Sequence, residues 1–353
     1  MNAGRLQNYA VYEGVAVVKR IGNLWPQITG FDNLLAAYYK ARLGKQTRNA
    51  VANFSFNLEE ELLLLQHQLQ AGSYHPGAYR QFIIRERKPR LISAAPFRDR
   101  VVHHAVMNVL EPILDKRFYF HSYACRQGKG VHKAVDQYQQ WAKRYAYVLK
   151  VDIARYFPSI RHDVLKAQLQ KIIKCKPTLQ LLDSIIDSSP SENAVGLPIG
   201  NLTSQYFANL YLNDVDHWLK QVLQVPAYCR YVDDLILLAD DKAYLWQYRD
   251  ALQDKLAEQG LALHARKQQL MRATERVDVL GYTVSRQRRW LRNDNGYRFQ
   301  RKLKHYAAQY YAKKKTLNDL RPSIMSWVGH AQHGETAGLQ VKLFRYGYSL
   351  NMG

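Results

Sequence analysis

The sequence has few cysteines and no long apolar run. Its three cysteines, Cys125, Cys175 and Cys229, are far apart and lack the spacing of zinc ligands. This argues against a disulfide-stabilised secreted domain and favours free thiols in a reducing cytoplasm. No apolar run approaches the roughly 18 residues that a membrane-spanning helix needs, and the N-terminus lacks the apolar core of a signal peptide. We therefore expect a cytoplasmic protein that does not bind or cross a membrane.

Acidic residues are also scarce. The chain has 29 Asp and Glu against 51 Lys and Arg, which gives a net charge of +22 over 353 residues. A surplus of this size in a folded chain indicates a polyanionic partner, and nucleic acid is a more common one than an anionic membrane. The length is sufficient for two or three subdomains. Because Arg126–Gly130 lacks a Lys-Ser or Lys-Thr pair, it is a basic turn rather than a nucleotide-binding P-loop.

Local patterns predict several elements. Asn57 and Glu60 have the spacing of a capping box, and the leucines that follow keep helical spacing as far as Gly72. Residues 78–100 resemble a β-hairpin rich in cations, and a second helix is expected over residues 102–113. Strands and helices are then expected to alternate from about residue 145. We expect no nuclease domain after the basic C-terminal segment, because the residues that follow it are too few.

The most informative segment is Tyr228–Leu237. Two adjacent aspartates, Asp233 and Asp234, separate an aromatic and β-branched run from an aliphatic run. This predicts two strands joined by a tight turn with an acidic tip. Adjacent anions repel each other, so a cation is expected between them, and hard oxygen ligands without a nearby thiolate favour Mg²⁺. A bare Asp-Asp pair is usually only a solvated turn, so a metal site requires a third carboxylate.

A third carboxylate is present in Asp152. Tyr147–Asp152 reads as a buried strand that ends in an acid. Three carboxylates that converge from different strands are what a two-metal site for phosphoryl transfer requires. The sequence therefore predicts such a site from Asp152, Asp233 and Asp234.

Asp152 and the Tyr231–Asp234 box resemble the catalytic motifs of reverse transcriptases. The resemblance implies an α+β, right-hand polymerase fold with fingers, a palm built on a split βαβ sheet, and a helical thumb. By the same resemblance, residues 1–144 are an N-terminal region with fingers and residues 145–285 are the palm. Part of the fingers is interleaved at about residues 158–200, and residues 286–353 are a basic thumb.

The resemblance also implies roles for individual residues. Asp152 and Asp233 are expected to bind both of two Mg²⁺ ions, for which Mn²⁺ can substitute, with the Ile153 carbonyl on one ion and Asp234 in support. Phe157 matches an aromatic gate against the ribose 2′-hydroxyl, although alone it reads as an ordinary core aromatic. The other implied nucleotide-binding residues are Arg85, Lys88, Arg90, Ala154, Arg155, Tyr156, Ile199, Gly200 and Lys267. The implied primer grip is Leu280, Gly281 and Tyr282.

Within the fingers, Arg90 is the best match to the arginine that clasps an incoming triphosphate. A guanidinium fork suits a triphosphate better than a flexible lysine does. Arg85 and Lys88 are the other cations of this segment that the resemblance implies. The alternative for all three is a surface hairpin held by salt bridges.

The box Gly196–Gln205 distinguishes groups within the family. Many reverse transcriptases carry glutamine where this chain has Ile199, which removes an amide hydrogen bond beside the nascent base pair, while Gly200 lets the backbone approach the nucleotide. This box and Ser326–Ala331 resemble the reverse transcriptases of diversity-generating retroelements. That resemblance implies copying of a template RNA into cDNA with errors at template adenines, for targeted gene diversification. The implied partners are template RNA, the RNA/cDNA duplex, dNTPs and a small basic accessory variability protein.

Two alternatives remain. One is a defence-associated or group II-like reverse transcriptase. The other comes from a different class, a catalytically silent RNA-binding scaffold, which the complete set of three aspartates argues against.

The C-terminal segment Arg286–Lys315 is the clearest basic patch. It holds eleven Lys or Arg and one acid, Asp294, with aromatic residues interleaved. Cations with aromatics suit contact with a nucleic-acid backbone, whereas a charge run alone is usually a solvated face. Leu303, Tyr306, Ala307, Tyr310 and Leu317 keep helical spacing, which predicts that part of the set packs inward. The residues expected to contact the backbone are Arg286, Arg288, Arg289, Arg292, Arg301, Lys302 and Lys304.

Overall fold

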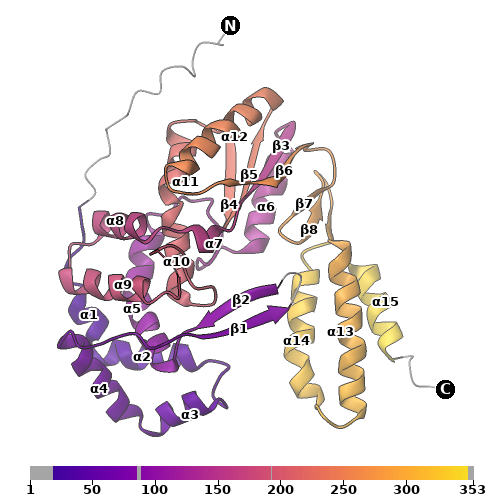
Figure 1. Ribbon diagram of the computed structural model, residues 1–353. Coiled ribbons are helices and arrows are strands. Elements are labelled where there is room, and N and C mark those ends of the chain that lie inside the picture. The colour runs from indigo at the N-terminus through magenta and orange to yellow at the C-terminus, as the bar shows by residue number, and fades with distance from the viewer. Residues whose placement is uncertain (1–18, 86–88, 192, 349–353) are drawn as a thin grey trace. The chain divides into compact units, whose positions relative to one another are not determined.

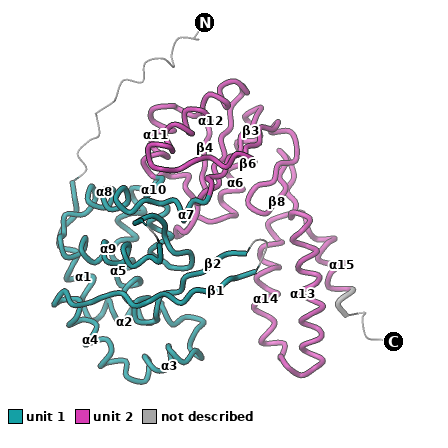
Figure 2. Tube along the Cα trace, viewed as in Figure 1, with its two compact units in different colours: residues 1–118, 155–212 teal, residues 119–154, 213–353 magenta. Residues whose placement is uncertain are grey.

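The computed structural model describes residues 19–85, 89–191 and 193–348 (Figure 1). The chain divides into two units, one formed by residues 1–118 and 155–212 and the other by residues 119–154 and 213–353 (Figure 2). Each unit is therefore built from two separate stretches of sequence. The three regions predicted from sequence, with boundaries at residues 144 and 285, remain predictions.

The first unit is mainly helical. Its helices are α1 (Trp25–Thr29), α2 (Phe31–Arg42), α3 (Asn49–Phe56), α4 (Leu58–Gln70), α5 (Phe97–Asp115), α7 (Tyr156–Ser159), α8 (His162–Ile172), α9 (Lys176–Asp187) and α10 (Leu202–Tyr211). Helix α5 lies against α1, α2, α3 and α10, and its Val102, Ala105, Val106 and Leu110 are buried. The predicted second helix is confirmed, and it is the centre of this unit's core.

Helix α4 confirms one expectation and contradicts another. Leu62, Leu65 and Leu69 form the buried stripe that their spacing predicts. The predicted capping box is wrong, because the Asn57 side chain makes no capping hydrogen bond. Asn57 also ends α3, and its φ of −110° and ψ of 39° lie outside the extended conformation that a helix N-cap usually adopts.

The predicted basic hairpin is confirmed. Strand β1 (Arg80–Arg85) pairs antiparallel with β2 (Pro89–Ala94), and Ile84 lies opposite Arg90. Every residue of β1 is exposed, so the hairpin projects from the helices that carry it. Lys88 lies outside the described residues.

The second unit contains a four-stranded antiparallel sheet. Its strands are β3 (Tyr147–Ile153), β4 (Ala227–Tyr231), β5 (Asp234–Ala239) and β6 (Leu263–Arg272), in the spatial order β4-β5-β3-β6. Helix α6 (Val131–Ala142) contacts β4, and α12 (Lys242–Ala257) contacts β3, β5 and β6. Helix α11 (Asn213–Gln221) contacts α12. Strand β3 thus occupies an inner position between β5 and β6.

The C-terminal part of this unit contains a small sheet and three helices. Strands β7 (Val277–Val279), β8 (Tyr282–Val284) and β9 (Arg289–Leu291) precede α13 (Asn293–Tyr311), α14 (Leu317–Ala331) and α15 (Ala337–Tyr348). The rings of Phe299 and Trp327 stack at 3.9 Å and join α13 to α14.

The helical stripe predicted over residues 303–317 is partly wrong. Helix α13 ends at Tyr311 and Leu317 begins α14, where its side chain is 62% exposed. Tyr310 is also exposed. Leu303, Tyr306 and Ala307 are half-buried, and Leu303 packs against the core, so this part of the stripe is confirmed. Phe299, one turn before the stripe, is buried.

None of the helices in the described parts of the chain is long and apolar enough to span a bilayer.

Candidate active site

Three carboxylates meet at one end of the four-stranded sheet. Asp152, near the end of β3, lies directly opposite Asp234, the first residue of β5. Side chains of directly opposed residues point to the same face of a sheet. Asp233 lies in the turn between β4 and β5, and its carbonyl accepts a hydrogen bond of 3.1 Å from the Ile153 backbone N–H. The predicted turn with an acidic tip is confirmed.

The two neighbouring carboxylates raise the cost of ionising Asp234. The pKa of Asp234 is raised to about 6, chiefly by burial and then by the negative charges of Asp233 and Asp152. The nearby Lys150 and Lys267 ammonium groups oppose this shift. A bound cation would therefore stabilise the ionised carboxylates of this site.

Lys267 supplies part of that positive charge. Its Nζ atom lies 2.7 Å from Oδ2 of Asp152, and its side chain is 41% exposed against 14% for Asp152. The pairing of β3 with β6 is irregular here, because Val151 lies opposite Gln268 while Ile153 lies opposite Leu263. Such an irregularity bends a strand and redirects its side chains, which is consistent with Lys267 reaching across to Asp152.

Lys150 is a second cation at the site, and it was not predicted. It precedes Asp152 by two residues on β3, so both side chains lie on one face of the strand. Burial lowers the pKa of Lys150, while Asp234, Asp278 and Asp152 raise it. Its Nζ donates to the Asp278 carbonyl. The two-residue spacing from Asp152 was the signal that could have identified it.

The donor chemistry of the site fits a hard divalent cation. Three carboxylates and the backbone carbonyls beside them offer only oxygen ligands, which suit Mg²⁺ better than a softer metal. Among the residues that the structure describes, no group of three His, Cys, Asp or Glu side chains is already arranged to hold a metal. This agrees with the ion pair of Asp152 with Lys267, since a ligand held by an ammonium group must be released before it can bind a metal.

The predicted nucleotide-binding residues are divided between the two units. Ala154 and Lys267 lie in the second unit with the carboxylates, whereas Arg85, Arg90 and the segment Arg155–Phe157 lie in the first. Arg155 has a positive φ of 47° and precedes α7. Tyr156 is buried, and its hydroxyl donates to the Ala208 carbonyl, so it holds α7 to α10. Of this segment, Arg155 and the half-buried Phe157 are the more accessible side chains.

Ile199 and Gly200 lie beside strand β2. The Ile199 carbonyl accepts a 3.0 Å hydrogen bond from the Ser93 N–H, and its side chain is half-buried. Gly200 has a φ of +115°, and a Cβ atom there would come within 2.8 Å of Ile92. This contact and this backbone conformation explain the glycine without any nucleotide.

The predicted primer grip forms the turn between β7 and β8. Leu280 and Gly281 have positive φ values of 47° and 95°. Tyr282 is buried, and its hydroxyl donates a 2.7 Å hydrogen bond to the His330 carbonyl in α14. The turn is thereby connected to the C-terminal helices.

The predicted backbone-binding cations fall into two sets. Arg289 is 12% exposed and pairs with Asp136 at 2.7 Å, and Arg286 donates to the Tyr145 carbonyl, so both have partners within the protein. Arg288 and Arg292 lie near acids, at 3.8 Å from Glu335 and 3.1 Å from Asp294.

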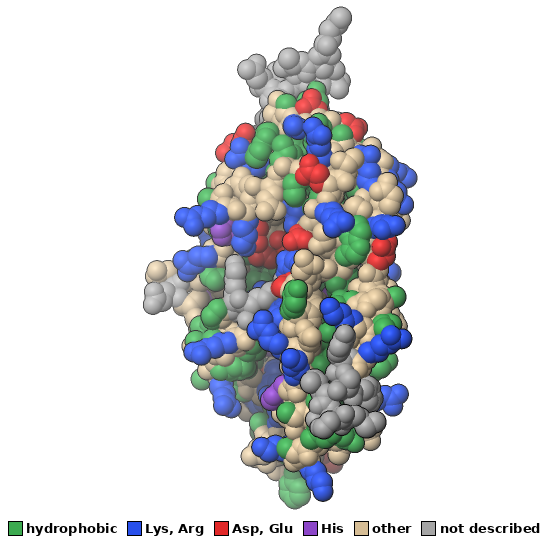
Figure 3. Space-filling model, turned by 90° about the vertical axis from the view of Figure 1, so that its right-hand side faces the viewer, with side chains coloured by type: hydrophobic (Ala, Val, Ile, Leu, Met, Phe, Trp, Pro, Cys, Tyr) green, Lys and Arg blue, Asp and Glu red, His purple; other side chains and the backbone are tan. Residues whose placement is uncertain are grey.

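Arg301, Lys302 and Lys304 form the more accessible set, exposed along α13. Figure 3 shows that Lys and Arg outnumber Asp and Glu over the face of the molecule on the side of α13 to α15. These three residues are therefore the strongest candidates for contact with a nucleic-acid backbone.

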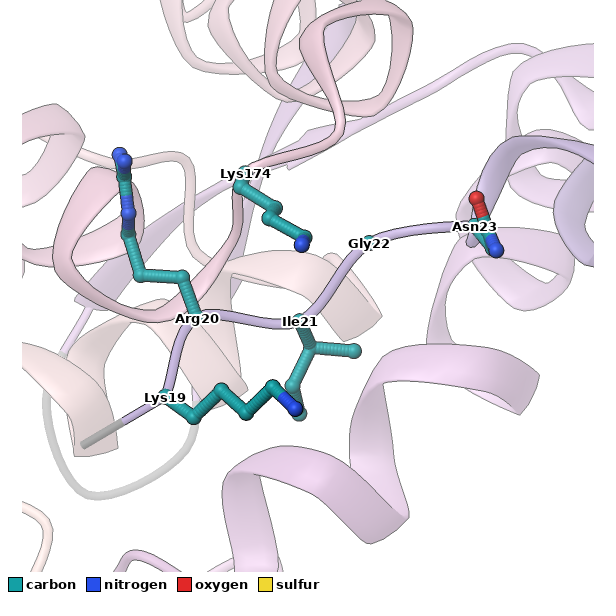
Figure 4. Close-up of a pocket in the computed structure, with 6 residues that line it drawn as sticks. All are labelled: Lys19, Arg20, Ile21, Gly22, Asn23 and Lys174. Atoms are coloured by element: carbon teal, nitrogen blue, oxygen red, sulfur yellow. The ribbon is translucent and has the colours of Figure 1, made fainter.

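The first unit has two basic cavities that sequence reasoning missed. One, of about 310 Å³, is lined by Lys19, Arg20 and Lys174, and none of the described residues in its lining is acidic (Figure 4). The other, of about 790 Å³, has Arg48, Arg80 and Arg100 in its lining. The cations of each cavity come from segments far apart in the sequence, so no local pattern could have identified them.

Comparison with known proteins gives a consistent result. Residues 83–284 match the sequence profile described as "Reverse transcriptase (RNA-dependent DNA polymerase)". Protein YkfC of Escherichia coli K12 is 24% identical over 65% of this chain and 73% of its own length. The group II intron-encoded protein LtrA of Lactococcus lactis is 25% identical over 46% of this chain and 29% of its own length. This chain thus spans less than a third of LtrA.

Among solved structures, apo telomerase from Candida tropicalis, truncated from its C-terminal domain, aligns with a TM-score of 0.47 and 12% identity. The alignment covers 62% of this chain and 57% of that one.

The family match alone covers more than half of the chain and includes all three carboxylates. The protein belongs to the reverse transcriptase family, so it has the α+β, right-hand polymerase fold of that family and is an RNA-directed DNA polymerase.

Proposed function

We propose that Asp152, Asp233 and Asp234 form the polymerisation site at which this enzyme extends a primer along a template RNA. The observation that carries the proposal is the register of β3 and β5, which places Asp152 directly opposite Asp234. Opposed like charges destabilise a sheet, so a site that keeps them is expected to gain from a bound cation. The reaction is in-line attack of a primer 3′-hydroxyl on the α-phosphate of a dNTP, which forms a phosphodiester bond, breaks the bond between the α- and β-phosphates, and releases pyrophosphate and the hydroxyl proton.

In this proposal Asp152 and Asp233 would hold two Mg²⁺ ions, with Asp234 in support and the Ile153 carbonyl as a further oxygen ligand. Bound ions activate the hydroxyl and neutralise the triphosphate charge. Lys267 releases Asp152 and moves toward the departing phosphates, which its 41% exposure permits.

The first unit supplies the remaining proposed contacts with the nucleotide. Arg85 and Arg90 are exposed on the β1–β2 hairpin and are proposed to bind the triphosphate. Phe157 is proposed to exclude a ribose 2′-hydroxyl. Ile199 and Gly200 are proposed to lie beside the new base pair.

The raised pKa of Asp234 makes metal use depend on pH. Below about pH 6 this carboxyl carries a proton, which Mg²⁺ must displace before the ligand is available. The Mg²⁺ concentration for half-maximal rate should therefore rise roughly tenfold for each pH unit below 6 and be nearly constant above 7. Mg²⁺ titrations of the initial rate from pH 5 to 8 measure this. If the Mg²⁺ concentration for half-maximal rate does not change with pH, Asp234 is not a metal ligand.

The same shift has a defined sign for metal-free stability. Because the folded pKa lies above the ordinary value of 3.8, folding favours the protonated carboxyl. The stability that this group contributes is fully present below about pH 4 and is lost as pH rises through 6. Added Mg²⁺ should therefore raise the melting temperature more at pH 7 than at pH 5.

As the finer assignment we propose a reverse transcriptase of a diversity-generating retroelement, error-prone at template adenines. The boxes Gly196–Gln205 and Ser326–Ala331 support it. A small basic accessory variability protein is then an expected partner. The three cysteines, which are free thiols, support a cytoplasmic location.

A group II-like reverse transcriptase is the second candidate. It is favoured by the similarity to the group II intron-encoded protein LtrA. Error spectra distinguish the two candidates, because only the retroelement assignment predicts errors concentrated at adenines.

Replacing Ile199 with Gln should lower misincorporation opposite template adenine several-fold, and less opposite other bases. The glutamine amide can make a hydrogen bond of about 1 kcal/mol that isoleucine cannot, and discrimination between base pairs depends on differences of this size. Sequencing of cDNA made by both proteins on one adenine-rich template measures the effect.

Two results of this experiment would contradict different parts of the proposal, the role of Ile199 and the retroelement assignment. Equal error spectra for the two proteins would mean that Ile199 only fills an apolar gap. A wild-type enzyme that is accurate at adenines on its own template would remove the retroelement assignment and favour the group II-like candidate.

A further inference from the structure

Beneath the catalytic turn lies an ion pair that is closed to solvent. Arg230, in β4, and Asp216, in α11, both have side chains with 0% exposure. Arg230 donates from Nε to Oδ1 of Asp216 at 2.8 Å and from its second terminal nitrogen to Oδ2 at 2.6 Å. Tyr228 donates to the same Oδ1 at 2.6 Å. Asp216 therefore holds the guanidinium at two points.

The remaining terminal nitrogen of Arg230 points to the turn. It donates a 3.1 Å hydrogen bond to the carbonyl of Val232, the residue immediately before Asp233. Val232 has a φ of +57°, which is an unfavourable backbone conformation for a β-branched residue. Such a conformation persists only where the surroundings hold it, and the bond from Arg230 is one such restraint.

The next carbonyl of the turn is also restrained. The Ile153 N–H donates to the Asp233 carbonyl at 3.1 Å. The backbone of Arg230 is fixed in turn, because its N–H donates to the His121 carbonyl and its own carbonyl accepts from the Tyr123 N–H. Both peptide groups of the turn are thereby tied to strands of the sheet.

Stability alone does not account for a buried ion pair. The cost of removing two charges from water can exceed their mutual attraction, and well-packed apolar residues often replace such pairs without loss of stability. Arg230 presents no surface to substrate or metal. A contribution to function must therefore pass through the groups that it holds.

We propose that Arg230 is a positioning residue for the metal-binding turn. Asp216 orients the guanidinium, the guanidinium fixes the Val232 carbonyl, and the backbone so fixed sets where the Asp233 and Asp234 carboxylates point. This inference rests on the proposed role of those carboxylates. It adds a supporting pair that takes no part in the chemistry.

The test is Arg230→Lys. A lysine keeps the positive charge beside Asp216, but a single ammonium group cannot reproduce the planar fork that reaches both carboxylate oxygens and the Val232 carbonyl. We expect kcat to fall ten- to a hundredfold and the Mg²⁺ concentration for half-maximal rate to rise at least fivefold. The KM for dNTP and the Kd for template-primer should change less than threefold. Mn²⁺ binding, followed by electron paramagnetic resonance without any substrate, should weaken in parallel.

Tyr228→Phe is the matched control. It removes a hydrogen bond to the same Asp216 oxygen and leaves the contact with Val232 in place. Its Mg²⁺ requirement and Mn²⁺ affinity should stay within twofold of the wild-type values. If Arg230→Lys lowers the melting temperature but leaves metal affinity unchanged, the pair is only structural and the inference is wrong.

Asp216→Asn is the second variant, and it should reproduce the weaker Mn²⁺ binding because it loosens the guanidinium. Loss of cooperative unfolding in both Arg230→Lys and Asp216→Asn would also overturn the inference, since the pair would then be required for the fold. An error in the proposed function would give a different result. Asp233→Asn would then still extend primers, whether or not Arg230→Lys lowers the rate.

Discussion

Replacing Asp233 with Asn should lower Mg²⁺-dependent dNTP incorporation about a thousandfold or more. The substitution keeps the size of the side chain and removes the negative charge that a two-metal site requires. A loss of this size corresponds to about 4 kcal/mol of transition-state stabilisation. Asp152→Asn should behave alike. Single-nucleotide extension of a labelled primer on an RNA template measures both effects.

The fold and the affinity for RNA should survive this change. Asp233 lies in a turn, and its backbone bond to Ile153 does not involve the side chain. Asp250→Asn is a suitable control, because this carboxylate lies on α12 and is 65% exposed. It should extend primers at the wild-type rate. Ordinary extension by Asp233→Asn would overturn the proposed site.

Neutralising Arg301, Lys302 and Lys304 together should weaken template-primer binding on the order of 100-fold at 0.1 M salt. Each lost phosphate contact should also flatten the log-log salt dependence by roughly one unit. The loss should be similar for unrelated sequences, because phosphate contacts carry no sequence information. Fluorescence anisotropy across a salt series measures affinity and slope together.

Arg292 and Arg298 provide the control within the same helix region. Both lie close to Asp294, at 3.1 Å and 3.4 Å, so their charges are already partly satisfied. Replacing these two with Gln should change the salt slope by less than the triple substitution does. A triple variant with an unchanged slope would mean that the cations of α13 are only solvated.

The three carboxylates of the candidate site were predictable because their signal is local. A strand that ends in an acid and a hairpin with an acidic tip are each contained in about ten residues, and the pairing of β3 with β5 then brings Asp152 opposite Asp234. The family resemblance pointed to Lys267. The irregular pairing of β6 that accompanies its approach to Asp152 has no recognisable sequence pattern.

Contacts between distant charged residues were not predictable. Arg289 was expected to bind a nucleic-acid backbone, yet it pairs with Asp136, which is 153 residues away in the sequence. Charged side chains are usually exposed, so a buried pair such as Arg230 and Asp216 reads in sequence like two surface residues. One hint was available, since Arg230 is the only charge in the run from Ala227 to Val232.

The two-stretch construction of the second unit has a consequence for folding. Residues 155–212 belong to the first unit and lie between β3 and the β4–β5 hairpin in the sequence. The strand that carries Asp152 must therefore find its partner across a long intervening segment, and such pairings form slowly because closing a long loop costs entropy. The hairpin of β4 and β5 can form early from local contacts. The complete set of three carboxylates is thus among the last features of this unit to assemble, so a nascent chain with a formed hairpin still lacks the proposed metal-binding centre.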